Sequence, residues 1–316
     1  MSFKSQLIDR IGERLTKEEI TLVPGGFQKV GDKIIINLPE ELNDKYSIIG
    51  EGILEVFPKI NSVFAKVGEI TGEFRRPQIK LIAGDDDSVV ENLENGTWFC
   101  YDAKKIMFAK GNVSERGRLQ KLVSDGEVIV DMFVGIGYFS LPIAKHSGVK
   151  KIYAIDLNPD SIYWLKKGIE KNRVEDKFEV SQGDSRELVS QLASEGIRAD
   201  RVLMGYLPPP EEFVPYALKI LKRGGIVHYD ALIRTDEIES DLENVRKLFQ
   251  DAADVGYQTS EIGYRRRAEF VNHKKAGTGD SEQEIGDSRK VMIVNAQRVK
   301  SYRPKVDHYV VDLQVF

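Results

Sequence analysis

The sequence has little cysteine, no long apolar run and no internal repeat. Its 316 residues include one cysteine, Cys100, which excludes an intramolecular disulfide framework and suits a reducing cytosol. No apolar run approaches the roughly 20 residues that a membrane-spanning helix needs. The opening stretch "MSFKSQLIDR" also lacks the apolar core of a signal peptide. We therefore expect a cytoplasmic protein that is not associated with a membrane.

The charge is unevenly spread along the chain. The stretch from Tyr264 to Lys305 contains 11 lysines and arginines against 5 acidic residues, a local charge of +6, whereas the whole chain carries −4. The remainder therefore carries −10. A basic stretch on an acidic protein is typical of a surface that binds a polyanion, although a solvated, lysine-rich loop would have the same composition.

Two different patterns follow one another along the chain. Residues 1–110 contain three strand candidates, "KIIINLP", "SVFAKVGEI" and "QIKLIAG", in the pattern of a small α+β domain. Residues 111–316 contain strand candidates that alternate with amphipathic segments, namely "EVIVDMF", "KIYAID", "FEVSQGD", "DRVLMGY" and "GGIVHYDAL". This alternation predicts a parallel sheet covered by helices on both faces. The last stretch, "HYVVDLQVF", is a further strand candidate.

One helix and one loop are marked clearly in the second domain. Asn158 is a plausible N-cap with Pro159 at the first helical position, and Ile162, Leu165 and Ile169 follow at helical spacing. The polar, glycine-containing stretch near residues 271–290 interrupts the alternation. It predicts an exposed loop insertion.

The stretch "DMFVGIGYF" predicts a ligand-binding turn. The strand should end near Phe133, and Gly135 and Gly137 should occupy the turn, where glycine permits positive φ and a close approach of the backbone to a ligand. A dinucleotide site would have a third glycine three positions later, where this chain has Ser140. The turn alone is therefore weak evidence for any particular ligand.

Acidic residues at successive strand ends make the prediction more specific. Asp156 ends "KIYAID", 25 residues after Asp131, and can accept hydrogen bonds from both hydroxyls of a ribose. Asp184 follows the next strand and can accept one from an adenine amino group. Each aspartate alone would more often be a cap or turn residue. Together with the glycines, at the carboxyl ends of parallel strands, they predict an adenosine pocket.

The order of glycine turn, strand-end acid and strand-end aspartate resembles class I S-adenosylmethionine-dependent transferases. The donor of these enzymes has no pyrophosphate, which accounts for Ser140. The implied fold is α/β: a class I, Rossmann-like transferase domain preceded by a smaller α+β domain.

Three further stretches, "GEFRRP", "YDAKKIMFAKGNVSERGRL" and "RVKSYRPKVDHYVVDL", resemble one particular family over roughly residues 65–316. Its members act on the guanosine 3′ of the phenylalanine tRNA anticodon. They comprise the tRNA guanine-N1 methyltransferases and the wybutosine-pathway aminocarboxypropyltransferases.

Two details favour the aminocarboxypropyl branch. The chain has Gly111-Asn112 where the methyltransferases usually carry an arginine, and "GYLPPP" where they tend to show N-L-P. The resemblance implies transfer of the 3-amino-3-carboxypropyl group of S-adenosylmethionine to C7 of 4-demethylwyosine in tRNA(Phe), with no metal and no obligatory protein partner. One alternative is guanine-N1 methylation, for which Glu115 would be the general base. Another is a non-catalytic tRNA-binding protein that retains the cofactor pocket.

The resemblance also implies roles for individual residues. Asp156 would hold the ribose, Asp184 the adenine, and Arg116 the carboxylate of the methionine arm. The full cofactor set that it implies is Ala109, Arg116, Gly135, Gly137, Asp156 and Asp184. Ala109 stands where serine is common in the family, which leaves at most a backbone contact there. Glu115 and Arg75, or the neighbouring Arg76, would organise the catalytic pocket. The tRNA contacts would come from Lys300, Arg303, Lys305 and Tyr206.

Overall fold

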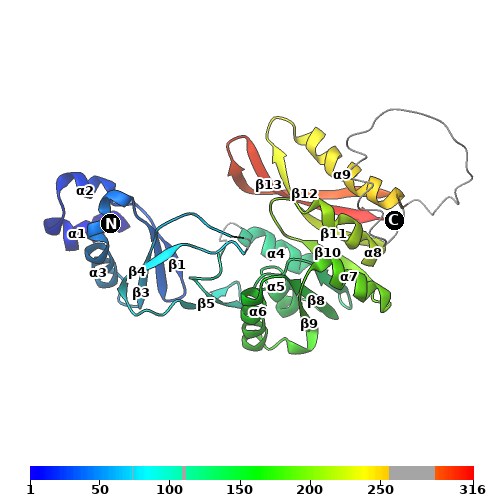
Figure 1. The fold of residues 1–316 in the computed structure, drawn as a ribbon, viewed down its shortest axis with the longest axis horizontal. Helices are drawn as coiled ribbons and strands as arrows, with labels where there is room; N and C mark the ends of the chain where they lie inside the picture. The colour runs from blue at the N-terminus through cyan, green and yellow to red at the C-terminus, as the bar shows by residue number, and fades with distance from the viewer. Residues whose placement is uncertain (73, 109–111, 256–288) are drawn as a thin grey trace, which may run out of the picture. The chain divides into compact units, whose positions relative to one another are not determined.

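The computed structural model describes residues 1–72, 74–108, 112–255 and 289–316 (Figure 1). The chain divides into two compact units. The first contains residues 1–123, 134–147 and 158–182, and the second contains residues 124–133, 148–157 and 183–316. Because the chain passes between the units several times, each unit is discontinuous. The predicted loop near 271–290 lies outside the described residues except at its last two positions, and Ala109 lies outside them too.

The first unit begins with a small α+β layer structure, as predicted. Its helices are α1 (Phe3–Ile11), α2 (Lys17–Leu22) and α3 (Tyr46–Val56), and its strands are β1 (Gln28–Val30), β2 (Lys33–Asn37), β3 (Ser62–Lys66) and β4 (Ile79–Gly84). The strands form one sheet in the order β1-β2-β3-β4, in which β2 and β3 are parallel. The alternating Ile34 and Ile36 of β2 are fully buried, against a cluster that includes Leu7 of α1 and Ile53 of α3.

The remainder of the first unit is built around a hairpin that the sequence analysis did not predict. Strands β5 (Val89–Glu94) and β6 (Thr97–Asp102) pair antiparallel through a two-residue turn, Asn95-Gly96, in which both residues have positive φ. Asn172 fixes β6 to α6, because its side chain exchanges hydrogen bonds of 2.9 and 2.7 Å with the backbone of Trp98. The other elements here are α4 (Val113–Leu122), α5 (Ser140–His146), α6 (Pro159–Asn172) and β9 (Phe178–Gln182).

The predicted start of α6 is confirmed. Asn158 is its N-cap, with a side-chain oxygen that accepts from the backbone N–H of Asp160 at 3.0 Å, and Pro159 occupies the first helical position. Ile162, Leu165 and Ile169 are buried on one face of the helix, as their spacing indicates.

Six strands of the second unit form a sheet in the order β12-β13-β11-β10-β7-β8. These are β7 (Val128–Asp131), β8 (Lys151–Asp156), β10 (Ala199–Met204), β11 (Leu221–Arg234), β12 (Val291–Arg303) and β13 (Val306–Val315). The predicted parallel arrangement is confirmed for β8, β7, β10 and β11. The edge differs, because β12 and β13 form a long antiparallel hairpin, and β12 was not predicted to be a strand.

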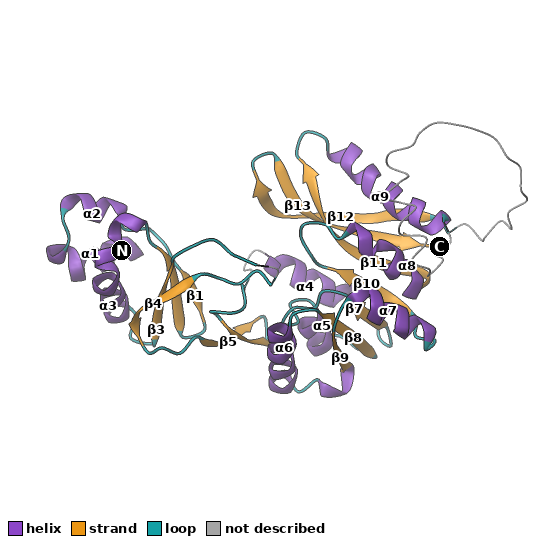
Figure 2. Cartoon of the chain, in the orientation of Figure 1, coloured by secondary structure: helices purple, strands orange, loops and turns teal. Residues whose placement is uncertain are grey.

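One face of this sheet is apolar and lies under helices α7 (Ser185–Ser194), α8 (Val214–Ile220) and α9 (Ile238–Asp254) (Figure 2). Residues at alternate positions of β11, among them Val227 and Tyr229, are buried there. No helix in the described part of the chain combines the length and the apolar composition needed to cross a bilayer.

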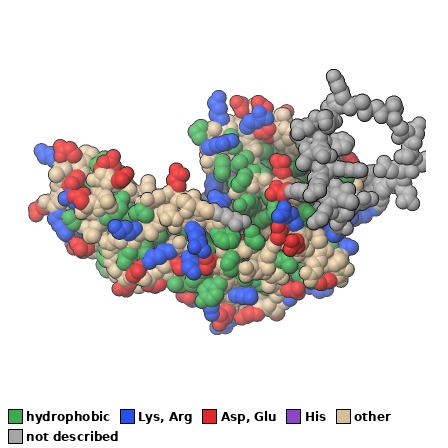
Figure 3. Space-filling model, viewed as in Figure 1, with side chains coloured by type: hydrophobic (Ala, Val, Ile, Leu, Met, Phe, Trp, Pro, Cys, Tyr) green, Lys and Arg blue, Asp and Glu red, His purple; other side chains and the backbone are tan. Residues whose placement is uncertain are grey.

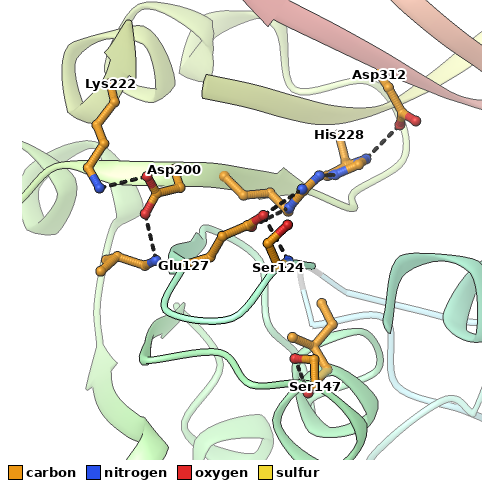
Figure 4. Close-up of polar contacts among 10 residues, drawn as sticks. Ser124, Glu127, Ser147, Asp200, Lys222, His228 and Asp312 are labelled. Atoms are coloured by element: carbon orange, nitrogen blue, oxygen red, sulfur yellow. Dashed lines mark hydrogen bonds and ion pairs between the residues drawn. The ribbon is translucent and has the colours of Figure 1, made fainter. Parts of the chain in front are cut away.

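The other face of the same strands carries a buried polar network (Figure 4). Arg201 of β10 donates from Nε to Glu127 at 2.9 Å and lies with Nη1 2.5 Å from Nε2 of His228. His228 Nδ1 lies 2.6 Å from Asp312 Oδ1, and Asp312 also accepts from Asn295 at 3.1 Å. Because a guanidinium only donates, Nε2 of His228 must accept, and the ring proton is on Nδ1 and faces Asp312. The network thus joins strands that are distant in the sequence.

Candidate active site

The glycine turn has the backbone conformation that the sequence predicted. Gly135 and Gly137 have φ values of 55° and 89°, in the left-handed region that favours glycine. A Cβ on Gly137 would lie 2.6 Å from the Leu141 side chain, and one on Gly135 would lie 2.8 Å from the ring of Tyr138. Local geometry therefore favours glycine at both positions, and their role in binding a ligand stays a prediction.

Two acidic residues lie at the carboxyl edge of the parallel strands of the second unit. Asp131 is the last residue of β7, is 1% exposed, and accepts from the backbone N–H of Phe133 at 3.3 Å. Asp156 is the last residue of the neighbouring strand β8 and is half-buried. The register pairs Asp131 with Ala154, so Asp156 stands two residues further along the same edge. This is where open α/β sheets bind ligands.

Asp184 follows a strand end, as predicted, and is also the N-cap of α7. Its carboxylate accepts from the backbone N–H of Arg186 at 2.8 Å, and from Nε and Nη2 of the same arginine at 3.0 and 2.5 Å. The hydrogen bond from the Arg186 side chain lowers the pKa of Asp184. A carboxylate offers about four acceptor positions. Arg186 Nε also lies 3.1 Å from Oδ2, so each carboxylate oxygen already accepts two hydrogen bonds. An adenine amino group would therefore share this carboxylate with Arg186.

The charged pair on α4 has partners inside the first unit. Arg116 is 2% exposed, and its Nε and Nη2 donate to both oxygens of Glu94 at 2.6 and 2.8 Å. Its guanidinium also lies over the ring of Phe108, at 5.3 Å. Glu115, 1% exposed, accepts two hydrogen bonds from Arg118 at 2.8 and 2.6 Å. The role of Arg116 at a methionine carboxylate stays a prediction, and that carboxylate would share the guanidinium with Glu94.

The two candidate arginines of "GEFRRP" lie in a tight turn. Arg75 has a positive φ of 52°, and its backbone N–H donates to the carbonyl of Gly72 at 3.0 Å. Arg76 donates from Nη2 to Asp160 at 3.1 Å, and Lys105 donates to the same carboxylate at 2.9 Å. Arg76 is therefore paired with Asp160 in the first turn of α6, and Arg75 stays the predicted catalytic arginine.

The predicted tRNA contacts fall on the β12–β13 hairpin and on the loop after β10. Lys300 is half-buried on β12, and Arg303 and Lys305 are exposed at the hairpin turn, around which Figure 3 shows Lys and Arg side chains. Within the described residues these three cations make no ion pair, whereas the neighbouring Arg298 is paired with Asp307 at 2.5 Å. They are therefore available for phosphates.

Tyr206, two residues after β10, is 37% exposed. One of its faces lies against the ring of Phe133 (centroids 5.2 Å apart, planes at 29°). His308 lies buried in β13. Across the described ranges, no three His, Cys, Asp or Glu side chains gather in a way that could hold a metal ion.

Four residues that contact a predicted site residue or each other were missed in the sequence: Glu94 beside Arg116, Arg186 beside Asp184, Phe133 beside Tyr206, and Phe213 beside Phe133. Glu94 could have been found, because the Asn95-Gly96 pair that follows it is a strong hairpin signal and puts it at a turn. Phe133 and Phe213 follow strands β7 and β10, and Arg186 lies in the first turn of α7; their mutual contacts are between elements distant in the sequence, for which it holds no periodic signal.

Comparison with known proteins gives consistent matches over the whole chain. Two family models match, the TRM5/TYW2 methyltransferase domain over residues 90–260 and the TYW2 N-terminal domain over residues 7–87. The tRNA(Phe) (4-demethylwyosine(37)-C(7)) aminocarboxypropyltransferase of Pyrococcus horikoshii is 34% identical over 99% of this chain and 97% of its own length. The tRNA (guanine(37)-N(1))-methyltransferase Trm5b of Pyrococcus abyssi is 32% identical over 77% of this chain and 70% of its own.

A solved structure agrees with these matches. The crystal structure of P. horikoshii TYW2 in complex with MeSAdo has a TM-score of 0.73 and 29% identity, and the match covers 99% of both chains.

Proposed function

The chain belongs to the TRM5/TYW2 methyltransferase family, and from this premise we propose that it is a tRNA aminocarboxypropyltransferase. It transfers the 3-amino-3-carboxypropyl group of S-adenosylmethionine to C7 of 4-demethylwyosine in tRNA(Phe) and releases methylthioadenosine. The observation that carries the proposal is the full-length match to an aminocarboxypropyltransferase together with the TYW2 N-terminal domain, since the match to Trm5b is shorter. We place the reaction in the cytoplasm, without an obligatory protein partner.

The residues of the site fit an adenosine-containing donor. The carboxylate of Asp184, shared with Arg186, suits the adenine amino group, and Asp156 at the end of β8 suits the ribose hydroxyls. The reaction then depends on which carbon of the sulfonium faces the base. When C7 attacks the γ-carbon of the methionine arm, the carbon–sulfur bond breaks, its electron pair neutralises the sulfur, and C7 loses its proton. Holding the arm in line is catalysis by orientation.

The sibling reaction, methylation of N1 of guanine, is the second candidate because Trm5b is nearly as similar in sequence. It would need a general base, for which Glu115 is the candidate. In this chain both oxygens of Glu115 are engaged by Arg118, and the side chain is 1% exposed. A base must reach the proton that it removes, so Glu115 would have to exchange its pair with Arg118 before it could act as a base in either reaction.

A double-label experiment tests the proposed function. The substrate is tRNA carrying 4-demethylwyosine, and the donor is labelled in either the methyl or the carboxyl carbon. We expect carboxyl label in the tRNA and methylthioadenosine in solution. Methyl label in the tRNA with S-adenosylhomocysteine in solution would establish the sibling reaction instead. Binding of both substrates with transfer of neither label would establish a non-catalytic tRNA-binding protein.

Replacing Lys300, Arg303 and Lys305 by alanine should weaken tRNA binding and flatten its salt dependence. Each phosphate contact contributes about 0.7–0.9 to the slope of log K against log salt, so the loss of three contacts should reduce the slope by about 2. The measurement is tRNA affinity at several salt concentrations. The control replaces Lys222 and Arg223 at the amino end of β11, at the opposite edge of the sheet. An equal slope for the triple variant and the wild type would place the tRNA on another surface.

A further inference from the structure

Three aromatic rings meet at the carboxyl edge of two neighbouring parallel strands. Phe133 stands two residues after β7 and Tyr206 two residues after β10, and these strands pair directly. The Phe133 ring is stacked with Tyr206 at 5.2 Å and packs edge-on against Phe213 at 4.9 Å and 73°. Since all three rings lie in the second unit, their arrangement is a property of that unit alone.

The same cluster is connected to the predicted adenine-binding carboxylate. The guanidinium of Arg186 lies over the ring of Phe213, 5.0 Å from its centroid. Arg186 also donates to both oxygens of Asp184, at 3.0 Å from Nε to Oδ1 and 2.5 Å from Nη2 to Oδ2. One side chain thus touches both the aromatic cluster and the residue expected to hold the donor. A guanidinium is well suited to this, because its plane can stack on a ring while its edge binds a carboxylate.

Exposure distinguishes the outer ring from the two inner ones. Tyr206 is 37% exposed, whereas Phe133 and Phe213 are half-buried behind it. Proteins that recognise RNA in single-stranded loops hold an unstacked base against an aromatic side chain. A ring that is supported from behind keeps a fixed orientation, which suits it to that task. A tricyclic base covers more of such a ring than a bicyclic guanine does, so stacking favours the tricyclic base.

We propose that Tyr206, backed by Phe133 and Phe213, is the stacking platform for the tricyclic acceptor base, and that Arg186 positions this platform relative to Asp184. This inference rests on the proposed function and deepens it. Tyr206 determines affinity for the modified base, and Phe133 and Phe213 act through Tyr206. Arg186 is a positioning residue, since it acts on the donor through Asp184 and on the acceptor through Phe213.

The first test replaces Tyr206 by leucine and by phenylalanine. Losing one base–aromatic stack should raise the KM for tRNA carrying 4-demethylwyosine by about tenfold to a hundredfold in Tyr206→Leu. Tyr206→Phe, which keeps the ring, should stay within about threefold of the wild type. The matched control is Tyr163→Leu on α6, because Tyr163 is 56% exposed and also packs against one aromatic ring, at 5.0 Å. Calorimetric binding of S-adenosylmethionine should be unchanged in all three variants, which also reports that each one is folded.

The second test separates a positioning residue from a merely structural one. Arg186→Gln should weaken S-adenosylmethionine binding and raise the KM for tRNA together, whereas Tyr206→Leu should change only the KM. Arg186→Lys keeps the charge near Asp184 but loses the planar fork, so it should restore donor binding more than it restores the KM. A change in donor binding alone for Arg186→Gln would overturn the link to the platform.

The outcomes distinguish this inference from the proposed function. If the wild-type enzyme does not transfer the carboxyl label, the proposed function fails whatever the variants do. If it does transfer the label but Tyr206→Leu has the same KM as Tyr163→Leu, the function stands and the platform is refuted. A raised KM for Tyr206→Leu that is equal for Tyr206→Phe would also refute stacking, because the ring would then be irrelevant.

Discussion

Replacing Asp156 by alanine is expected to weaken the binding of S-adenosylmethionine by about a hundredfold or more while the protein stays folded. Asp156 ends β8 at the carboxyl edge of the parallel strands, where its carboxylate can accept from both ribose hydroxyls. Hydrogen bonds to a charged group contribute about 1.5–3 kcal/mol each. Losing two of them should therefore weaken binding by about a hundredfold or more. Isothermal calorimetry gives the affinity, and thermal unfolding without donor checks the fold.

Two further variants make that result specific. Asp156→Asn keeps one acceptor oxygen and should fall between the wild type and Asp156→Ala. Asp236→Ala removes an exposed aspartate from the loop after β11 and should bind the donor as the wild type does. Unchanged affinity in Asp156→Ala would show that the ribose is held elsewhere and that the strand-end acid is only a turn residue.

Most of the fold was predictable because its buried strands are apolar and because α6 is marked by Asn158 at its N-cap and Pro159 at its first helical position. Two of the strands that were missed, β12 and β5, lack that signal. β12, "VMIVNAQRVKSYR", lies at the edge of the sheet, so most of its residues are at least partly exposed and its sequence mixes apolar, amide and basic residues. β5 reads as polar for the same reason, since only Val90 of its residues is buried. Edge strands have one unpaired side, and their sequences carry less of the alternation that marks a strand.

The site was predictable in its positions but not in its pairings. The strand-end locations of Asp156 and Asp184 and the positive φ of Gly135 and Gly137 follow from local sequence. The ion-pair partner of Arg116 does not follow from local sequence. Glu94 is 22 residues away on the β5–β6 hairpin, and nothing in the sequence of α4 indicates this pairing. Long-range pairings depend on sheet order and loop packing, which a single sequence does not encode in any local pattern.

Replacing Arg201 by methionine is expected to lower the stability of the folded protein strongly, because Arg201 is buried in a polar network that the sequence does not indicate. "DRVLMGY" reads as a strand with an outward-facing arginine, but Arg201 is 4% exposed and donates to Glu127 at 2.9 and 3.1 Å. His228, at 2.5 Å from Arg201, depends on the same guanidinium, and Asp312 stands behind it. Removing one partner of a buried ion pair costs about 3–5 kcal/mol, because it leaves the other charge buried and unpaired. Urea unfolding should report this as a lower midpoint with an unchanged m value.

A second substitution separates the cost of an unpaired charge from the contribution of the pair. Glu127→Leu in the Arg201→Met background removes the stranded carboxylate, and replacing a buried pair by apolar side chains is often neutral. The double variant should therefore recover much of the lost stability, although His228 still lacks its donor at Nε2. Lys167→Ala, which breaks an exposed pair with Glu170, should cost about 0.5 kcal/mol at most. If the double variant is instead as unstable as Arg201→Met, Arg201 stabilises the fold chiefly through His228 of β11 and Asp312 of β13, and its pair with Glu127 contributes little.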